Sequence, residues 1–179
     1  NIGDDTVNVH YKQLEPWQIT LVDTGEASMT GGRLLRLRKY LDSTFLFTYG
    51  DGLADINIEA LIKHHKEQNL LGTITAVQPP GRYGALRLEK GKVTRFKEKP
   101  DGDYHWINGG FFVANTSIFE KISGDNCCWE SDILPIAARQ GSLNAYQHRG
   151  FWHPMDTLRD CTKLEELWHA KSAPWKIWR

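Results

Sequence analysis

The sequence predicts an α/β fold with a mixed, mostly parallel sheet flanked by helices, and three observations carry that prediction. Apolar runs of strand length alternate along the chain with stretches whose apolar residues recur at helical spacing. One run, Phe45-Leu46-Phe47-Thr48-Tyr49, is continuously apolar or weakly polar, which is typical of a strand covered on both faces. Glycine, proline and aspartate residues separate the runs. Strands that alternate with helices in this way favour a layered α/β architecture.

In the first half of the chain, the expected elements begin with a strand at residues 19–22. They continue with a helix at 33–41, a strand at 45–49, a helix at 58–65, a strand at 73–77, and a hairpin of 85–88 with 92–96. Leucines at positions 34, 37 and 41 give the first helix its spacing. The hairpin is predicted because Lys90-Gly91 stands between two strand-like runs.

The second half is expected to contain a glycine-containing loop that leads into a strand over residues 107–113, helices at 116–122 and 132–140, a strand at 143–147, and a helix at 158–169. Gly141 stands where a helix commonly ends. The tail Ala173-Pro174-Trp175 is expected to dock back on the body. We find no linker or repeat, and 179 residues suit one domain over positions 1–179.

Composition excludes several classes of function. Lys+Arg 22 balances Asp+Glu 22, which argues against a nucleic-acid binder that would neutralise phosphates with clustered basic residues. An aromatic content of 11% with zero net charge argues against disorder. No apolar run approaches the roughly 18 residues of a membrane span.

The compartment is expected to be the cytoplasm. The opening residues are polar and acidic rather than those of a signal peptide. Three cysteines, of which Cys127 and Cys128 are neighbours, do not form a secreted disulfide framework, and reduced thiols are the simpler interpretation. Their spacing relative to the histidines fits no zinc site.

Two aspartates are candidate metal ligands. Asp51 lies between glycines directly after the most apolar strand, and ligands of open α/β sheets bind beyond the carboxyl ends of strands. A carboxylate there suits Mg²⁺, although an ordinary Asp-Gly turn is the simpler alternative. Asp156 lies between an aromatic segment and a predicted helix, where it could equally be the helix N-cap.

Other polar residues suit a sugar phosphate. Glu98 could accept hydrogen bonds from sugar hydroxyls and Lys99 could bind a phosphate, unless both lie on an exposed hairpin strand. Asn108 precedes Gly109 and Gly110, an arrangement that lets a sugar ring approach the backbone or that simply forms a bulge.

Two further segments have a functional and a simpler interpretation. The segment Gly81-Arg82-Tyr83-Gly84 is either a substrate loop or a tight turn. Arg33, at a predicted helix start, either faces an anion or is a surface arginine.

Taken in order, these segments resemble the sugar-phosphate nucleotidyltransferases, and within them the branch that makes CDP-glucose. The motifs that carry the resemblance lie at residues 15–17 (EPW), 20–25 (TLVDTG), 28–33 (SMTGGR), 45–52 (FLFTYGDG), 79–86 (PPGRYGAL), 98–100 (EKP), 107–112 (INGGFF), 150–152 (GFW), 154–160 (PMDTLRD) and 173–176 (APWK). They extend over essentially the whole chain.

The resemblance implies a Rossmann-like nucleotide-diphospho-sugar transferase fold and a reaction of CTP with α-D-glucose 1-phosphate that gives CDP-glucose and pyrophosphate. The sugar-phosphate oxygen would attack the α-phosphorus in line, a reaction that needs positioning and charge neutralisation. By resemblance, Asp51 and Asp156 hold Mg²⁺, and Lys99 binds the sugar phosphate.

The resemblance also assigns binding residues and partners. Gly84, Glu98, Asn108 and Gly109 would line the sugar phosphate, while Ser28, Arg33 and Asp51 would contact the nucleotide. Members of this kind usually form homo-oligomers, and CDP-glucose commonly feeds the synthesis of bacterial O-antigen and lipopolysaccharide sugars.

One departure from the family pattern concerns the nucleotide phosphates. The family opens with a strand and a glycine-rich loop, Gly-Gly-x-Gly-Thr-Arg, whose backbone N–H groups cradle the triphosphate. This sequence does not contain that loop. We therefore expect the chain to be the N-terminally truncated, C-terminal portion of the domain, and to be poorly active in isolation.

Three alternatives remain open at the level of sequence. The first is a thymidylyl- or uridylyltransferase acting on the same sugar phosphate. The second is a metal-dependent nucleotide-sugar glycosyltransferase that uses the Asp51-Gly52-Leu53-Ala54-Asp55 segment. The third is a non-catalytic protein that binds sugar phosphate or assembles with intact subunits.

Overall fold

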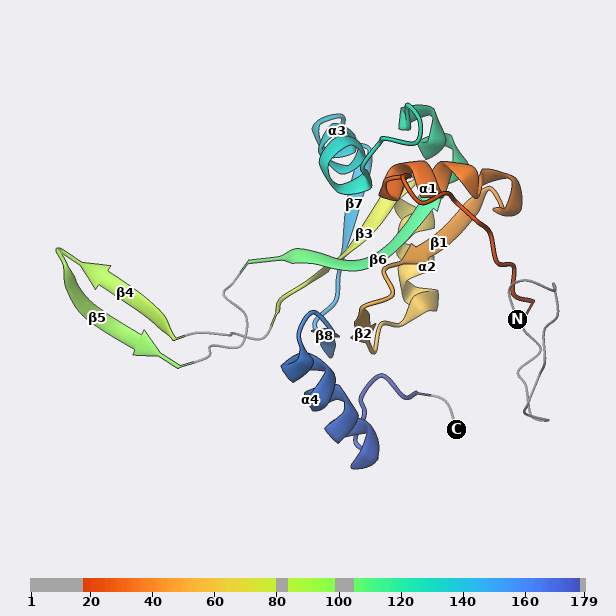
Figure 1. Cartoon of the computed structure of the whole chain (residues 1–179). Coiled ribbons are helices and arrows are strands. Elements are labelled where there is room, and N and C mark those ends of the chain that lie inside the picture. Colours follow the sequence, from red (N-terminus) through yellow and green to blue (C-terminus); the bar gives the residue numbers. More distant parts are fainter. Residues whose placement is uncertain (1–17, 80–83, 99–104, 178–179) are drawn as a thin grey trace.

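The structure, a computed structural model, describes residues 18–79, 84–98 and 105–177 (Figure 1). Its main sheet has four strands in the order β1-β6-β3-β7. Their bounds are Thr44–Thr48 for β1, Ile107–Asn115 for β6, Gly72–Val77 for β3 and Leu143–Gln147 for β7. Two smaller ladders pair β2 (Gly52–Ala54) with β8 (Trp152–Pro154) and β4 (Ala85–Glu89) with β5 (Lys92–Lys97).

Four α-helices accompany these strands within the described residues. They are α1 (Thr30–Arg36), α2 (Ile58–Gln68), α3 (Leu134–Arg139) and α4 (Leu158–His169). Shorter 3₁₀ turns lie at Arg38–Tyr40 and Thr116–Lys121, and a π-helical turn lies at Trp129–Ile133. The mixed α/β class predicted from the sequence is confirmed. None of the helices in the described part of the chain is long and apolar enough to cross a membrane.

Strand direction decides where a ligand site can form. β6 runs antiparallel to both β1 and β3, whereas β3 and β7 are parallel. Three of the four strands therefore share one direction, but two of the three pairings are antiparallel because β6 lies between β1 and β3. The predicted mixed sheet is confirmed, whereas its pairings within the described residues are mostly antiparallel rather than mostly parallel. The carboxyl ends of β1, β3 and β7 thus meet the amino end of β6 at one edge of the sheet.

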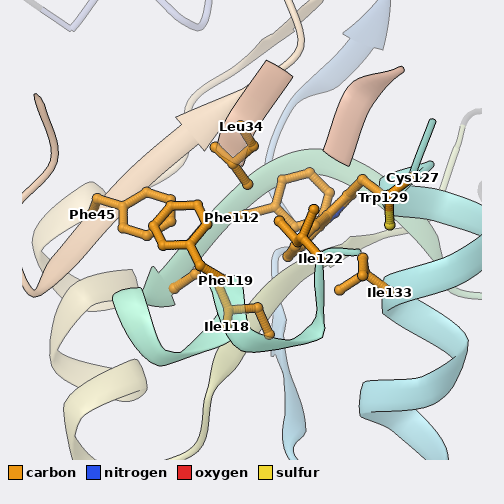
Figure 2. Packing of buried hydrophobic residues seen from close by; sticks show 10 residues of the cluster. Leu34, Phe45, Phe112, Ile118, Phe119, Ile122, Cys127, Trp129 and Ile133 are labelled. Atoms are coloured by element: carbon orange, nitrogen blue, oxygen red, sulfur yellow. The ribbon is translucent and has the colours of Figure 1, made fainter. Parts of the chain in front are cut away.

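The sheet is covered on both faces. On one face Phe112 packs in a cluster with Trp129 and with Leu34 of α1 (Figure 2). Phe112 also stacks on Phe47 at a centroid distance of 4.6 Å, and Trp129 meets both of these rings edge-on. On the other face Val113 packs with Leu61 of α2. Neighbouring residues of β6 point to opposite faces, so these two clusters fix the orientation of the strand that leads into the site.

Two expectations for the N-terminal part are corrected. Residues 19–22 are irregular, with Ile19 72% and Leu21 90% exposed, because no described strand pairs with them and an isolated strand has no ladder to stabilise it. The helix predicted at 33–41 begins at Thr30 and ends at Arg36, followed by the 3₁₀ turn. It contains Gly32 because a Cβ there would lie 2.3 Å from the Asp125 carbonyl oxygen.

In the C-terminal half, residues 116–121 form a 3₁₀ turn rather than an α-helix, and the helix predicted at 132–140 is a π turn followed by α3. Gly141 has φ +64°, which confirms its place after the helix. The tail also docks as expected, because the Trp175 ring lies 5.4 Å from that of Phe151. The β4–β5 hairpin is confirmed, with positive φ at Lys90 and Gly91 in its turn.

Candidate functional site

A pocket of about 220 Å³ opens at the edge where the strand ends meet. Its walls come from the end of β1, the start of β6 and the β2–β8 ladder. The lining residues are Thr48, Tyr49, Asp51, Gly52, Asn108, Gly109, Gly110, Trp152, Pro154 and Asp156. Four residues proposed from the sequence therefore share one pocket, namely Asp51, Asn108, Gly109 and Asp156.

The β2–β8 ladder brings the two aspartates together although they lie far apart in the sequence. Gly52 pairs with Pro154, and the Met155 N–H donates to the Asp51 carbonyl oxygen at 2.7 Å. Asp51 and Asp156 therefore flank the same end of the ladder, and both face the pocket.

The donor set suits Mg²⁺ better than a metal that needs a full protein cage. The described residues contain no group of three or more histidine, cysteine, aspartate or glutamate side chains that could hold a metal ion. Mg²⁺ is usually held by one or two carboxylates together with waters and substrate phosphates. A pair of aspartates at an open pocket fits that pattern.

Asp156 does not cap the following helix. The N-cap of α4 is Thr157, whose hydroxyl accepts from the Asp160 N–H while the Asp160 carboxylate accepts from the Thr157 N–H. The interpretation of Asp156 as the helix cap is therefore wrong. The capping box instead fixes the start of α4 directly beside Asp156.

The amide of Asn108 is held by hydrogen bonds at both ends. Its Oδ1 accepts from the Gly110 N–H at 2.8 Å, and its Nδ2 donates to the Tyr49 hydroxyl at 3.4 Å. These bonds fix which way the side-chain amide faces in the pocket.

Gly109 and Gly110 are required by packing as well as by any ligand. A Cβ on Gly109 would lie 2.8 Å from Val77 Cγ1, and one on Gly110, whose φ is +77°, would lie 2.8 Å from the Tyr49 ring. The β3–β6 register also shifts here, between Ile74 and Ala76. The bulge considered from the sequence is therefore present, and it forms part of the pocket wall.

Trp152 of β8 also lines the pocket. Its indole N–H donates to the Gly109 carbonyl oxygen at 2.8 Å, which ties β8 to the start of β6. The pocket is therefore braced by a bond between two segments that both line it.

Ser28 and Arg33 lie outside the residues that line this pocket. The Ser28 hydroxyl donates to the Thr24 carbonyl at 2.6 Å, and Arg33 donates to the Thr24 hydroxyl at 2.8 Å and the Glu26 carbonyl at 3.1 Å. Both side chains therefore hold the loop before α1, and their predicted contact with a nucleotide stays a prediction.

Gly84 and Glu98 lie together at the base of the β4–β5 hairpin, away from the pocket-lining residues. A Cβ on Gly84 would lie 3.1 Å from a carboxylate oxygen of Glu98. Lys99 and residues 81–83 lie outside the described residues. The structure thus pairs Gly84 with Glu98 but does not join them to Asp51 and Asn108.

A polar network behind the pocket was not found from the sequence. The Tyr49 hydroxyl donates to Glu130, on the π turn. Burial raises the pKa of Tyr49, and the hydrogen bond to Glu130 raises it further. Burial also raises the pKa of Glu130, but hydrogen bonds from Tyr49, Thr30 and Cys128 outweigh it and leave that pKa below its usual value. Because Glu130 lies 81 residues from Tyr49, no local sequence pattern reveals this contact.

Comparison with known families identifies the class of protein. The sequence profile of the family described as "Nucleotidyl transferase" matches residues 6–172. The chain belongs to this family.

Individual relatives show which members of the family the chain is similar to. The chain is 52% identical to a glucose-1-phosphate cytidylyltransferase of Salmonella typhi, over 99% of this chain and 70% of that protein. It is 38% identical to a probable glucose-1-phosphate cytidylyltransferase of Bacillus subtilis, over 93% of this chain and 66% of that protein. Within the nucleotidyl transferases it is therefore a relative of the glucose-1-phosphate cytidylyltransferases.

Solved structures support the same fold. HddC from Yersinia pseudotuberculosis matches with a TM-score of 0.61 at 24% identity, covering 80% of this chain and 64% of that one. A UDP-glucose pyrophosphorylase complexed with UDP-glucose matches with a TM-score of 0.61 at 17% identity, covering 84% and 65%. At these identities the likeness concerns the fold alone, and it confirms the nucleotidyltransferase architecture.

Proposed function

We propose that the chain carries the site for transfer of the cytidylyl group from CTP to α-D-glucose 1-phosphate, which gives CDP-glucose and pyrophosphate. The relatives' names support the two substrates, since a glucose-1-phosphate cytidylyltransferase is 52% identical over 99% of this chain. The observation that carries the proposal is the convergence of Asp51 and Asp156 on the pocket that also contains Asn108 and Gly109.

The two aspartates would hold Mg²⁺. When bound, the ion would neutralise charge on the phosphates during an in-line displacement. The contribution of the chain is to bring both aspartates to one end of the β2–β8 ladder, where the hydrogen bond from the Met155 N–H to the Asp51 carbonyl oxygen holds their backbone segments together. Segments held in this way need little backbone reorganisation on binding, which favours the transition state.

Residues from both the main sheet and the β4–β5 hairpin would bind the sugar phosphate. Asn108 and Gly109 line the pocket and offer an amide and a bare backbone to sugar hydroxyls. Glu98, next to Gly84, would accept further hydroxyl bonds, and Lys99 would neutralise the phosphate.

The nucleotide would contact Ser28, Arg33 and Asp51. The Arg33 guanidinium carries five N–H donors, so a phosphate contact is compatible with the bonds that it makes to Thr24 and Glu26. The same loop bonds would hold the start of α1 in place while the nucleotide is bound.

We further propose that the protein acts in the cytoplasm as a homo-oligomer and that its product supplies O-antigen and lipopolysaccharide sugars. The free cysteines Cys127, Cys128 and Cys161 are compatible with a reducing compartment. The oligomer and the pathway rest on the resemblance to the family.

The test is pyrophosphate release with glucose 1-phosphate and Mg²⁺, measured in parallel with CTP, dTTP and UTP. We expect the highest kcat/KM with CTP. A higher value with dTTP or UTP would replace the cytidylyl assignment with the thymidylyl or uridylyl alternative. Release of a nucleoside diphosphate from a nucleotide sugar on addition of a sugar acceptor, without pyrophosphate, would favour the glycosyltransferase.

A further inference from the structure

Glu130 lies behind the pocket and accepts hydrogen bonds from the side chains of three residues. Its Oε1 accepts from the Tyr49 hydroxyl at the end of β1. Its Oε2 accepts from the Thr30 hydroxyl of α1 at 2.7 Å and from the Cys128 thiol at 3.1 Å. Glu130 itself is half-buried and does not line the pocket.

The direction of each hydrogen bond follows from the carboxylate. An ionised carboxylate only accepts hydrogen bonds, so both hydroxyls must give it their protons. The Thr30 hydroxyl in turn accepts from the Trp129 N–H at 2.9 Å. The Tyr49 hydroxyl has one proton, which goes to Glu130, so it acts as an acceptor toward Asn108.

This chain of bonds ends on the side chain of Asn108. Because the Tyr49 hydroxyl accepts, it faces the Nδ2 group of Asn108, and the Oδ1 atom is then directed at the Gly110 N–H, 2.8 Å away. If the amide were reversed, two donors would face each other at Gly110.

We propose that Glu130 is a positioning residue, which acts through the Tyr49 hydroxyl to set the orientation in which the Asn108 amide faces the pocket. Only the identity of the ligand rests on the proposed function, which assigns Asn108 to glucose 1-phosphate. The lowered pKa of Glu130 supports the role, because it keeps the carboxylate ionised and therefore acceptor-only at neutral pH.

A Glu130→Gln substitution changes the hydrogen-bond donors and acceptors at this position with almost no change in the shape of the side chain. Glutamine has one acceptor oxygen and one NH₂ group in place of two acceptor oxygens. If its oxygen faces Thr30 and Cys128, its NH₂ faces Tyr49, whose hydroxyl must then accept from it and turn its own proton toward Asn108. Two donors then meet between Tyr49 and Asn108 Nδ2, so the Asn108 amide has to turn away from Tyr49 or reverse, and either change weakens its hydrogen bond from the Gly110 N–H.

Asp132 supplies a matched control on the same turn. Its carboxylate accepts from the Cys128 N–H at 2.7 Å and from the Ser131 hydroxyl at 2.9 Å. Asp132→Asn removes the same charge from the same turn, but these bonds do not lead to Tyr49 or Asn108.

The first readout needs no substrate and is hydrogen exchange at the Gly110 backbone amide, resolved by NMR. We expect exchange to be roughly ten-fold faster in Glu130→Gln, as for the loss of one hydrogen bond, and unchanged in Asp132→Asn. Tyr49→Phe, which keeps the ring on Phe112, should reproduce the effect, and the double variant should add nothing to it. Unchanged Gly110 exchange in both Glu130→Gln and Tyr49→Phe would overturn the proposal.

The second readout is pyrophosphate release by the full chain. Glu130→Gln should raise the KM for glucose 1-phosphate roughly ten-fold, while the KM for CTP stays within about two-fold, because only the sugar side of the pocket is altered. An equal rise in both KM values, or a rise of the same size in Asp132→Asn, would indicate a structural role and contradict the proposal. If the unaltered chain shows no turnover of glucose 1-phosphate even when it is supplied with the glycine-rich segment of its relatives, the proposed function fails, while Gly110 exchange still decides the role of Glu130.

Discussion

The main sheet and the β4–β5 hairpin hold their residues by different amounts of packing. Phe112, in the middle of β6, is 2% exposed, stacks on Phe47 and meets Trp129 edge-on, whereas Phe96, in β5, is 62% exposed. Every described residue of β4 and β5 is exposed, and Figure 1 shows the hairpin extending away from the sheet. A two-stranded ladder on its own is marginally stable in water.

This difference in packing separates the residues that were proposed to bind the sugar phosphate into two groups. Asn108 and Gly109 are held by the sheet, by Tyr49 and by the indole of Trp152. Glu98 and Gly84 are held by the base of the hairpin. The sheet therefore provides a fixed geometry for the proposed metal ligands and the amide, and the hairpin provides residues whose placement depends on a single ladder.

The largest expected effect is a difference in unfolding free energy between substitutions in the main sheet and in the β4–β5 hairpin. Phe112→Ala should lower the free energy of unfolding by about 3–5 kcal/mol, because a buried aromatic ring is replaced by a cavity. Phe96→Ala should change it by no more than about 0.5 kcal/mol. Urea unfolding followed by tryptophan fluorescence measures both, and equal losses would contradict the contrast between sheet and hairpin.

The next effect concerns the chemistry. Asp51→Asn and Asp156→Asn should each lower kcat/KM about 100-fold or more, since each removes charge from the proposed Mg²⁺ site. Glu98→Gln should instead raise the KM for glucose 1-phosphate by roughly ten-fold, with a smaller change in kcat. Steady-state kinetics of pyrophosphate release distinguishes these outcomes, and a larger kcat loss for Glu98→Gln would place the chemistry on the hairpin.

A smaller effect tests how the sheet side holds Asp156. Thr157→Ala removes the N-cap hydroxyl of α4 and should cost about 1 kcal/mol of unfolding free energy. Thr157→Ser keeps an oxygen able to cap the helix and should restore most of that loss. If alanine and serine at this position gave the same stability, the capping box would not be what fixes the start of α4.

The smallest effect is the pH dependence of an exposed ion pair. The Arg36 guanidinium donates two hydrogen bonds to the Asp125 carboxylate and lowers the pKa of that carboxyl from its ordinary 3.8. A depressed folded-state pKa stabilises the protein above pH 3.8, and that contribution is lost as the pH falls through the lowered value. The difference in unfolding free energy between the unaltered chain and Asp125→Asn should therefore shrink on acidification.

The size of that contribution should also fall in high salt, because both partners are exposed to solvent. Chemical denaturation at several pH values and two salt concentrations checks both trends. A difference that grows as the pH falls below 3.8 would contradict the sign of the linkage.

Local patterns in the sequence predicted the elements that carry their own signals. The apolar run at β1, the helical spacing of α2 and the Lys90-Gly91 turn all gave elements at the expected places. Residues 19–22 carry a strand pattern but have no described partner, so the pattern alone did not make a strand.

The site was predictable where it follows from strand ends and not where it follows from long-range contacts. Asp51 and Asn108, which both line the pocket, were proposed from the sequence because ligands bind where strands end and glycines allow close approach. The pairing of β2 with β8 and the bonds to Glu130 depend on tertiary structure, since they join residues about a hundred positions apart or come from an irregular turn.

The most direct test of the account is to map where a paramagnetic divalent ion binds. Mn²⁺, which takes the same oxygen ligands as Mg²⁺, would be added with CTP to the ¹⁵N-labelled chain, and the broadening of backbone amide signals recorded. A metal site at Asp51 and Asp156 predicts broadening centred on Asp51, Gly52 and Asp156 that is lost in Asp51→Asn and retained in Asp132→Asn. Broadening centred on the β4–β5 hairpin, or unchanged in Asp51→Asn, would contradict it.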